Sequence, residues 1–391
     1  MKRTLFILLD GLRKDYVCAA TMPFLFELQQ RSTCAEVIET FAFQTRPSYM
    51  AGLHPEQSLI ANMFEYSPQQ SPFRIARFLP TWAIPKGSKA ERVVRHFLSV
   101  WARCVERHRS HTASCIYCTT AQIPLTLLPY FGFSEKRQIH EPNSLPQPSL
   151  FDLLRRKNID WLWAGYPLDH GTTENILAKY QQASRSQFCY LHFSELDWVG
   201  HQYGPDSAEI RECAAKLDEV LKRIFAEQPE PFNFIVFGDH GMVQVEQEID
   251  FYQVQQQVSL RPKRDYLYFL DSTQVRFWFF NERARQRIID VWSDVAGGHF
   301  LTESEQTELH IRFPDNRFGD ACFMAHGGMI FLPNFFQGRQ PIVGMHGYLP
   351  DVVGNRTCLV GYRGGSHEQL GLIDQVQIYD FLVKCLGPDG C

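Results

Sequence analysis

Acidic residues and histidines recur in this sequence directly after short apolar runs. The runs are typical of buried strands, and a carboxylate at the end of a buried strand needs a compensating charge. Imidazole nitrogens and carboxylate oxygens are ligands for zinc and similar cations. The candidates are Asp10, Asp197, His201, Asp239, His240 and His346. They are numerous enough to hold two cations, and such a pair can stabilise the attacking and leaving oxygens of a displacement at phosphorus.

The apolar runs that must position these residues alternate with helical patterns. Continuously apolar runs indicate parallel strands that are buried on both faces of a sheet. These runs are Leu5–Leu9, Trp161–Ala164, Cys189–Phe193 and Phe234–Phe237. The helical patterns are Met22–Arg31, Ser149–Arg156, Ser207–Ala226, Glu282–Val295 and Asp374–Cys385. The alternation predicts an α/β fold with a mainly parallel central sheet and helices on both faces, whose active site lies beyond the carboxyl ends of the strands.

We expect one catalytic domain over residues 1–391 with two inserted regions. Residues 70–147 are rich in proline and are predicted to form a cap. Residues 256–320 combine a strand-like Gln274–Phe280 with a helical pattern and are predicted to form a small α/β subdomain. Because loops positioned by a rigid scaffold carry specificity, we expect these regions to select the leaving group.

The cap region contains a strongly basic segment. Residues 74–109 carry nine Lys or Arg against two Glu, a local charge of +7 in a chain whose net charge is -4. Six apolar residues recur there at helical spacing, which predicts a basic amphipathic helix. They are Val94, Phe97, Leu98, Trp101, Cys104 and Val105. We favour packing of this stripe on the core. The alternatives are a lid that steers an anionic substrate and docking on an anionic membrane surface.

Composition argues against several other classes of protein. A net charge of -4 is atypical of a protein that binds duplex nucleic acid. The 11 cysteines are odd in number and irregularly spaced, which argues against a disulfide framework, and Cys115 and Cys118 lack the partners of a zinc site. The first apolar run is too short for a signal peptide, and no run of about 18 apolar residues occurs. We therefore expect a cytoplasmic protein.

Five blocks of residues carry a resemblance to a known family. They are Asp10-Gly11, Thr45-Arg-Pro-Ser48, Asp197-Trp-Val-Gly-His201-Gln-Tyr-Gly-Pro205, Gly238-Asp-His-Gly-Met242 and Met345-His-Gly-Tyr348. In this order they resemble the alkaline phosphatase superfamily, and most of all its nucleotide pyrophosphatase/phosphodiesterase branch. The resemblance extends from residue 4 to about residue 365. The block from Asp197 to Pro205 and the block from Gly238 to Met242 are specific for this family. The Asp-Gly and His-Gly pairs would be weak signals alone.

The resemblance implies two divalent cations, zinc or manganese, and a nucleophile. One cation would be bound by Asp197, His201 and His346. The other would be bound by Asp10, Asp239 and His240, with Thr45 bridging towards it. Thr45 would attack phosphorus, and the phospho-threonine would then be hydrolysed.

Three further residues near these blocks have expected or alternative roles. The resemblance implies that Asn62 contacts a phosphoryl oxygen. Arg46 replaces the aromatic residue that usually follows the nucleophile, and it either contacts phosphate through its planar fork or is solvated. Ser48 is the competing nucleophile. We assign no role to His54, His192 and His326, because a structural or surface role is the commoner one for a single histidine.

The sequence thus predicts a metal-dependent phosphodiesterase or pyrophosphatase that acts on a small-molecule, lipid or glycan phosphate ester. The alternatives are a phosphomonoesterase or a phosphate-ester mutase on the same metal site, and a non-catalytic binder of phosphorylated ligands. A sulfatase is disfavoured, since Thr45 cannot supply the formylglycine that sulfatases require. Fold resemblance warrants the reaction class and leaves the substrate open.

Overall fold

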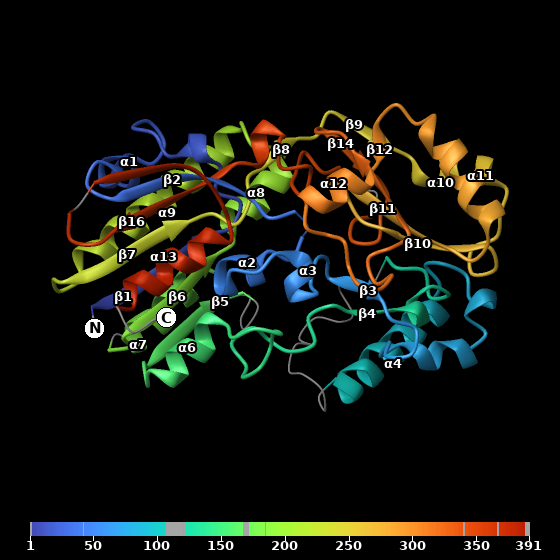
Figure 1. Cartoon of the computed structure of the whole chain (residues 1–391), viewed down its shortest axis with the longest axis horizontal. Coiled ribbons are helices and arrows are strands. Elements are labelled where there is room, and N and C mark those ends of the chain that lie inside the picture. The colour runs from blue at the N-terminus through green and yellow to red at the C-terminus, as the bar shows by residue number, and fades with distance from the viewer. Residues whose placement is uncertain are drawn as a thin grey trace.

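The computed structural model describes residues 2–41, 43–106, 120, 122–166, 172–183, 185–338, 341–365 and 367–387 (Figure 1). A seven-stranded sheet forms its main part. In spatial order the strands are β17 (Glu368–Asp374), β2 (Thr33–Ile38), β16 (Thr357–Tyr362), β7 (Phe232–Phe237), β1 (Arg3–Leu9), β6 (Phe188–Phe193) and β5 (Trp161–Gly165). Strand β16 is antiparallel to both of its neighbours, and the other neighbouring pairs are parallel. The mainly parallel α/β fold predicted from the sequence is confirmed.

Helices cover both faces of this sheet, because its central strands are apolar on both sides. In β1, Leu5, Ile7 and Leu9 pack into one core, whereas Phe6 and Leu8 pack into the other. The first core is closed by α1 (Pro23–Gln29), α7 (Thr173–Gln182), α8 (Glu195–Tyr203) and α9 (Ala208–Ala226). The second is closed by α2 (Arg46–Ala51), α6 (Leu150–Arg156) and α13 (Gln377–Cys385).

A second, four-stranded antiparallel sheet lies beyond the main one (Figure 1). Its strands are β10 (Tyr266–Leu270), β11 (Gln274–Phe279), β13 (Ala321–Ala325) and β12 (Gly298–Phe300). The helices near it in sequence are α10 (Phe251–Val258), α11 (Glu282–Ser293) and α12 (Glu303–Glu308). The cap contributes β3 (Phe64–Tyr66), β4 (Phe131–Phe133), the 3-10 turns η2 (Arg74–Phe78) and η3 (Thr81–Ala83), and helix α4 (Lys89–Glu106). Both regions contribute to one hydrophobic core. The domain boundaries themselves stay a prediction.

Short elements connect these layers. They are α3 (Pro55–Ser58), β8 (Val243–Gln244), β9 (Gln247–Ile249), β14 (Met329–Phe331), β15 (Gly344–Met345), and the 3-10 turns η1 (Lys14–Tyr16), η4 (Leu128–Tyr130) and η5 (Val353–Asn355). The predicted strands and helices are present, with one correction. The pattern over Asp374–Cys385 is helical only from Gln377, because Asp374 ends β17 and its carboxylate accepts from the backbone N–H of Val376.

Helix α4 is present, but the prediction that its apolar stripe packs on the core is wrong for half of the stripe. Leu98 and Ala102 are buried, whereas Phe97 is 45% exposed and Trp101 is 40% exposed. Arg95 is also buried, where it pairs with Glu91 at 2.6 Å. The buried face therefore consists of small, apolar and ion-paired residues, and the bulky aromatic ones point outward.

Two expectations concern the chain as a whole. In the part of the chain that the structure describes, no helix combines the length and apolarity needed to span a bilayer. The eight described cysteines are free thiols. Cys115 and Cys118 lie outside the described residues.

Candidate metal centre

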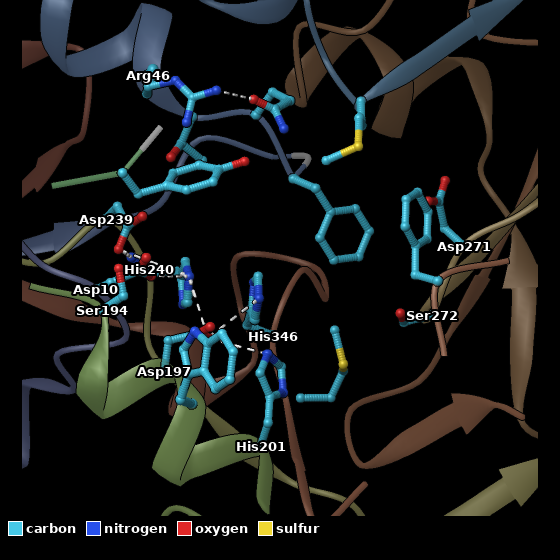
Figure 2. Close-up of a pocket in the computed structure, with 18 of the residues that line it drawn as sticks. Asp10, Arg46, Ser194, Asp197, His201, Asp239, His240, Asp271, Ser272 and His346 are labelled. Atoms are coloured by element: carbon cyan, nitrogen blue, oxygen red, sulfur yellow. Dashed lines mark hydrogen bonds and ion pairs between the residues drawn. The ribbon is translucent and has the colours of Figure 1, made fainter. Parts of the chain in front are cut away.

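The predicted ligands converge at the carboxyl edge of the main sheet. Asp10 follows β1, Asp239 and His240 follow β7, Asp197 and His201 lie on α8 after β6, and His346 follows β15. All six line one cavity of about 320 Å³. Figure 2 shows their side chains facing one another on one side of this cavity, and we call them the acid–histidine cluster. The structure thus brings together residues that are more than 300 positions apart in the sequence.

Gly11 lets the turn after β1 approach helix α8. It has a φ of +76°, and a Cβ atom there would lie 3.1 Å from the Cα atom of Asp197. A left-handed backbone conformation favours glycine. The backbone N–H of Gly11 also donates to Oδ1 of Asp239 at 3.4 Å. A larger residue would therefore push apart two segments that carry cluster residues.

The first potential ligand group is the one expected from the sequence. Ligand atoms of Asp197, His201 and His346 all lie within 4.8 Å of one another. Oδ1 of Asp197 is 3.1 Å from Nε2 of His201 and 3.8 Å from Nε2 of His346. The second group consists of Asp10, Asp197 and His240, with Oδ1 of Asp10 3.1 Å from Nε2 of His240. Asp197 is therefore common to both groups.

Asp239 stands beside the second group. Its Oδ1 atom is 3.8 Å from Nε2 of His240, and its side chain lines the cavity. The same oxygen accepts from the backbone N–H of His240 at 3.1 Å. Of the expected trio, Asp10 and His240 thus meet in one group of ligand atoms, whereas Asp239 lies beside that group and Asp197 belongs to it.

The hydrogen bonds of two histidines show that the cluster fits a cation. Nδ1 of His201 contacts the carbonyl of Gly344 at 2.8 Å, and Nδ1 of His240 contacts the carbonyl of Gly241 at 2.8 Å. A carbonyl oxygen only accepts, so each Nδ1 carries the hydrogen and a neutral ring turns the lone pair of Nε2 towards the carboxylates. Oδ1 of Asp197 is buried and has no hydrogen-bond partner. The lone pairs of these Nε2 atoms and the carboxylate oxygens repel one another, and a cation between them would remove this repulsion.

The pKa values of the cluster are shifted in opposite directions. Burial alone would lower the pKa of His240, but the carboxylates of Asp239 and Asp10 raise it well above its ordinary value. The pKa of His201 is raised because Asp197 outweighs burial. The pKa of His346 is lowered well below its ordinary value by burial and by the neighbouring histidines. Burial and the charge of Asp10 raise the pKa of Asp239 to about 6.

Thr45 lines the same cavity at the N-terminus of α2. Its side chain is largely buried and makes no capping hydrogen bond to the helix, so the hydroxyl is not used to build α2. Ser48, the competing nucleophile, is 2% exposed, donates to the carbonyl of Leu53 at 3.3 Å and is not among the residues that line the cavity. Of the two hydroxyls, the geometry favours Thr45.

Arg46 lines the cavity and is not solvated. It is 9% exposed, and its Nη2 atom donates to Gln44 and to Glu135, each at 2.8 Å. Its guanidinium also lies over the ring of Tyr166, 5.5 Å from the centroid. The charge of Glu135 more than offsets burial and raises the pKa of Arg46. The guanidinium is thus fixed in one orientation at the edge of the cavity.

Asn62 is placed differently from the other expected site residues. It is 2% exposed and is not among the residues that line the cavity. Its amide donates to Oδ2 of Asp271 at 3.0 Å, and Asp271 also pairs with the buried Arg276 at 3.2 Å. Asp271 itself lines the cavity, across from the cluster (Figure 2). Asn62 is thus linked to the cavity through Asp271.

His192 is a site residue to which the sequence analysis assigned no role. It lies in β6, lines the cavity, and its Nε2 atom is 2.9 Å from Oδ2 of Asp10. Its other nitrogen is 3.4 Å from the hydroxyl of Tyr190. The sequence does offer one signal for His192, because it is a polar residue inside the apolar run Cys189–Phe193. His54 and His326 are not among the residues that line the cavity.

The rest of the cavity wall is aromatic and polar. It was not predicted as a whole, because its residues come from segments that are far apart in the sequence, and only Trp198 and Met345 lie within the sequence blocks quoted above. Its residues are Phe43, Gln44, Tyr49, Met63, Tyr166, Ser194, Trp198, Asp271, Ser272, Phe336, Gln337 and Met345. Trp198, next to Asp197, is 75% exposed. The cavity can therefore hold a phosphate group against the cluster and an organic group against these rings.

Comparison with known proteins agrees with this geometry. The family described as type I phosphodiesterase / nucleotide pyrophosphatase matches residues 4–349. Human ectonucleotide pyrophosphatase / phosphodiesterase 5 has a similar fold, with a TM-score of 0.67, 14% identity, and coverage of 99% of this chain and 95% of that one. An inactive variant of the murine protein in complex with AMP has a TM-score of 0.68 at 15% identity, with the same coverage of both chains.

Curated relatives match over a short stretch. GPI ethanolamine phosphate transferase 2 of Yarrowia lipolytica is 27% identical over 78 residues, which are 20% of this chain and 9% of that protein. The corresponding protein of Saccharomyces cerevisiae is 32% identical over 81 residues, 19% of this chain and 10% of that protein. The matches thus span about a tenth of the length of these relatives.

Proposed function

Since the chain belongs to the type I phosphodiesterase / nucleotide pyrophosphatase family, we propose that it hydrolyses a phosphodiester or phosphoanhydride bond of a small molecule, with Thr45 as nucleophile. The observation that carries this proposal is the position of Thr45, whose hydroxyl caps no helix and lines the same cavity as the acid–histidine cluster. A hydroxyl is a weak nucleophile at neutral pH, so it requires activation by a neighbouring group.

We propose that the cluster supplies this activation by holding two divalent cations. Asp197, His201 and His346 would hold one, and Asp10, Asp239 and His240 would hold the other. Bound there, zinc or manganese would lower the pKa of the Thr45 hydroxyl and offset charge on the phosphoryl group. The support is the buried, unpartnered oxygen of Asp197 and the Nε2 atoms of His201 and His240, which face carboxylates.

The reaction would proceed by two displacements. Oγ1 of Thr45 loses its proton to solvent and forms a bond to phosphorus, and the bond between phosphorus and the leaving oxygen breaks with its electron pair on that oxygen, which takes up a proton from solvent. The oxygen of a water molecule then forms a bond to phosphorus as the bond between phosphorus and Oγ1 of Thr45 breaks, and a proton from that water restores the Thr45 hydroxyl. Arg46, held by Glu135 and Gln44, would donate to a phosphoryl oxygen in both steps. The phosphoryl contact of Asn62 stays a prediction and would use the N–H that does not bind Asp271.

A second candidate is transfer of the phosphoryl-linked group to an acceptor hydroxyl instead of water. The names of the curated relatives, which are ethanolamine phosphate transferases, favour it. The acceptor would have to enter after the leaving group departs, and the exposed Trp198 marks an open side of the cavity. The phosphomonoesterase, mutase and non-catalytic alternatives, a lipid or glycan substrate, and the cytoplasmic location stay predictions.

The proposal is tested by a hydrolysis screen with defined metals. Bis-p-nitrophenyl phosphate, mono-p-nitrophenyl phosphate, nucleotide anhydrides and phospholipid head groups are compared for the wild type, Thr45→Ala and Ser48→Ala. We expect diester or anhydride cleavage that Thr45→Ala lowers by about 10³-fold or more, with Ser48→Ala near wild type. Preferred cleavage of the monoester would support the phosphomonoesterase alternative. Product formation only when an acceptor alcohol is present would support transfer.

A further inference from the structure

Helix α4 carries apolar side chains on the surface that faces away from the core. Val93, Phe97, Val100 and Trp101 are 69%, 45%, 44% and 40% exposed. They are spaced at i, i+4, i+7 and i+8, which places them on one side of a helix. We call them the outer face of α4. An exposed apolar stripe of this kind marks an interaction site more often than chance.

Two aromatic residues in the same cap are still more exposed. Phe78, at the end of η2, is 86% exposed, and Trp82, in η3, is 80% exposed. Figure 1 shows that this segment and α4 belong to the same lobe of the molecule. Aromatic side chains gain free energy from burial, so two that protrude almost fully are not explained by packing within the chain.

The fold does not require the outer face of α4 to be apolar. The opposite side of the helix already anchors it, through buried Leu98 and Ala102. Arg95 adds hydrogen bonds to the carbonyls of Thr120 and Ile123, at 2.7 Å and 2.9 Å. The buried face therefore anchors the helix to the rest of the cap. The outer face is not needed for this and is accessible to a binding partner.

The charge around this face is mostly positive. Six basic side chains of the cap are exposed and make no ion pair among the described residues; they are Arg74, Arg77, Lys86, Lys89, Arg92 and Arg103. From residue 74 through the end of α4 this segment holds two acids, which are Glu106 and the buried Glu91 that is paired with Arg95. The cap segment that carries the apolar stripe thus has an excess of positive charge, although the whole chain has a net charge of -4.

We propose that the outer face of α4, with Phe78 and Trp82, docks the protein on a membrane surface that contains anionic lipid. The aromatic rings would enter the head-group layer, where amphipathic rings such as that of Trp are favoured. The basic side chains would extend past the helix and contact lipid phosphates. Charge complementarity selects this occupant. A nucleic acid would use the basic groups but has no use for Val93 and Val100 in the middle of the face.

Docking of this kind is independent of the chemistry proposed for Thr45. A single amphipathic helix gives reversible attachment, and its strength depends on both the buried apolar area and the anionic lipid. The two contributions can be separated, because the aromatic and basic residues can be changed independently. Neither set lines the cavity.

The experiment is co-sedimentation of the full chain with vesicles of phosphatidylcholine, with and without about 30% phosphatidylserine. We expect binding to the anionic vesicles, weakened by about 1 M salt. Two double variants, Trp82→Ala with Trp101→Ala, and Lys89→Glu with Arg92→Glu, should each weaken it by about tenfold. The matched controls, Phe280→Ala and Lys216→Glu with Lys222→Glu, change exposed residues elsewhere and should bind as the wild type does.

A second readout reports insertion directly. Brominated lipids should quench the Trp fluorescence of the wild type and leave that of Trp82→Phe with Trp101→Phe largely unquenched. Circular dichroism establishes that each variant is folded. The proposal is overturned if no vesicle is bound, if the variants bind as well as the wild type, or if the face instead mediates self-association or binding to RNA or heparin without binding vesicles.

Discussion

The acid–histidine cluster and the outer face of α4 depart from ordinary folding rules in opposite directions. The cluster buries acids and histidines at the edge of the main sheet, whereas α4 exposes aromatic and branched side chains. Both arrangements cost stability, because charges lose water in the first and apolar surface keeps it in the second. In the cluster, part of the cost is offset internally by opposite charges. In the part of the chain that the structure describes, the outer face of α4 stays exposed, and we propose that its compensation comes from outside.

This difference suggests that the two regions serve contacts with different partners. The cluster is directional, since His201 and His240 are oriented by backbone carbonyls and the neighbouring His192 is oriented by the carboxylate of Asp10. The outer face of α4 is open and has no fixed hydrogen-bonding groups of that kind. A cavity of the first type suits a small phosphate ester, and a surface of the second type suits a fluid lipid layer.

The largest effect is expected where both ligand groups meet. Asp197→Asn should remove the charge common to the two groups and lower kcat/KM by about 10³-fold, with loss of bound metal. Elemental analysis measures the bound metal, and steady-state kinetics measure kcat/KM. Asp206→Asn, which changes an exposed acid shortly after α8, is the control. Full activity in Asp197→Asn would show that the cluster does not act as one site.

The next effect concerns His192, which positions Asp10. His192→Ala should lower kcat by about 10- to 100-fold, because partners of metal ligands orient them. His192→Gln can still place a donor near Oδ2 of Asp10 and should recover part of the loss. The distinguishing readout is metal affinity, measured by competition with a chelator. Equal loss of activity in both variants, with unchanged metal affinity, would contradict a positioning role.

The free energy of unfolding should depend on pH through Glu39, an acid that is buried at the edge of the main sheet. Burial raises the pKa of Glu39, which follows β2, from 4.5 to about 8. The folded protein then keeps a proton that the unfolded chain releases, so stability is lost as pH rises from about 4.5 to 8. Glu39→Gln has no such proton to lose.

Chemical denaturation with a chelator present measures this effect. Relative to the wild type, Glu39→Gln should gain on the order of 2 kcal/mol between about pH 5 and about pH 9. A difference that stays constant across this range would show that Glu39 is ionised in the folded protein. The cost of buried charge at this edge would then be met by other groups.

The smallest effect is expected on α4 and separates its two faces. Phe97→Ala should change the free energy of unfolding by less than about 0.5 kcal/mol, since its side chain is largely outside the core. Leu98→Ala, one residue further on, should cost about 3 kcal/mol because it leaves a cavity. Thermal unfolding compares the two. Equal losses would mean that the outer face is packed in solution.

The sequence predicted those parts of the fold that repeat a simple local pattern. Strands β1, β6 and β7 are continuous apolar runs and were found, and the ligands that follow them were found with them. Strand β17 was missed because it is an exposed edge strand with a glycine and mixed polarity. The helical spacing in α4 defined an apolar stripe, but neighbouring positions such as Phe97 and Leu98 share that stripe and the spacing does not say which packs inward.

Contacts between distant segments were beyond sequence reasoning for a different reason. The partner of His192 is set by the register of β6 against β1, and the orientation of Arg46 is set by Glu135 in the cap. Neither partner is near in the sequence. The role expected for Asn62 depends on a contact of this kind, because its amide binds Asp271, which is also far away in the sequence.

The most direct measurement is acid quenching of the enzyme during turnover of a diester, followed by mass spectrometry of the peptide that contains Thr45. The account predicts a phosphoryl adduct on Thr45 that appears with substrate, disappears on further turnover, and is absent from Thr45→Ala and present in Ser48→Ala. Turnover that continues in Thr45→Ala, with no adduct at any residue of α2, would contradict it.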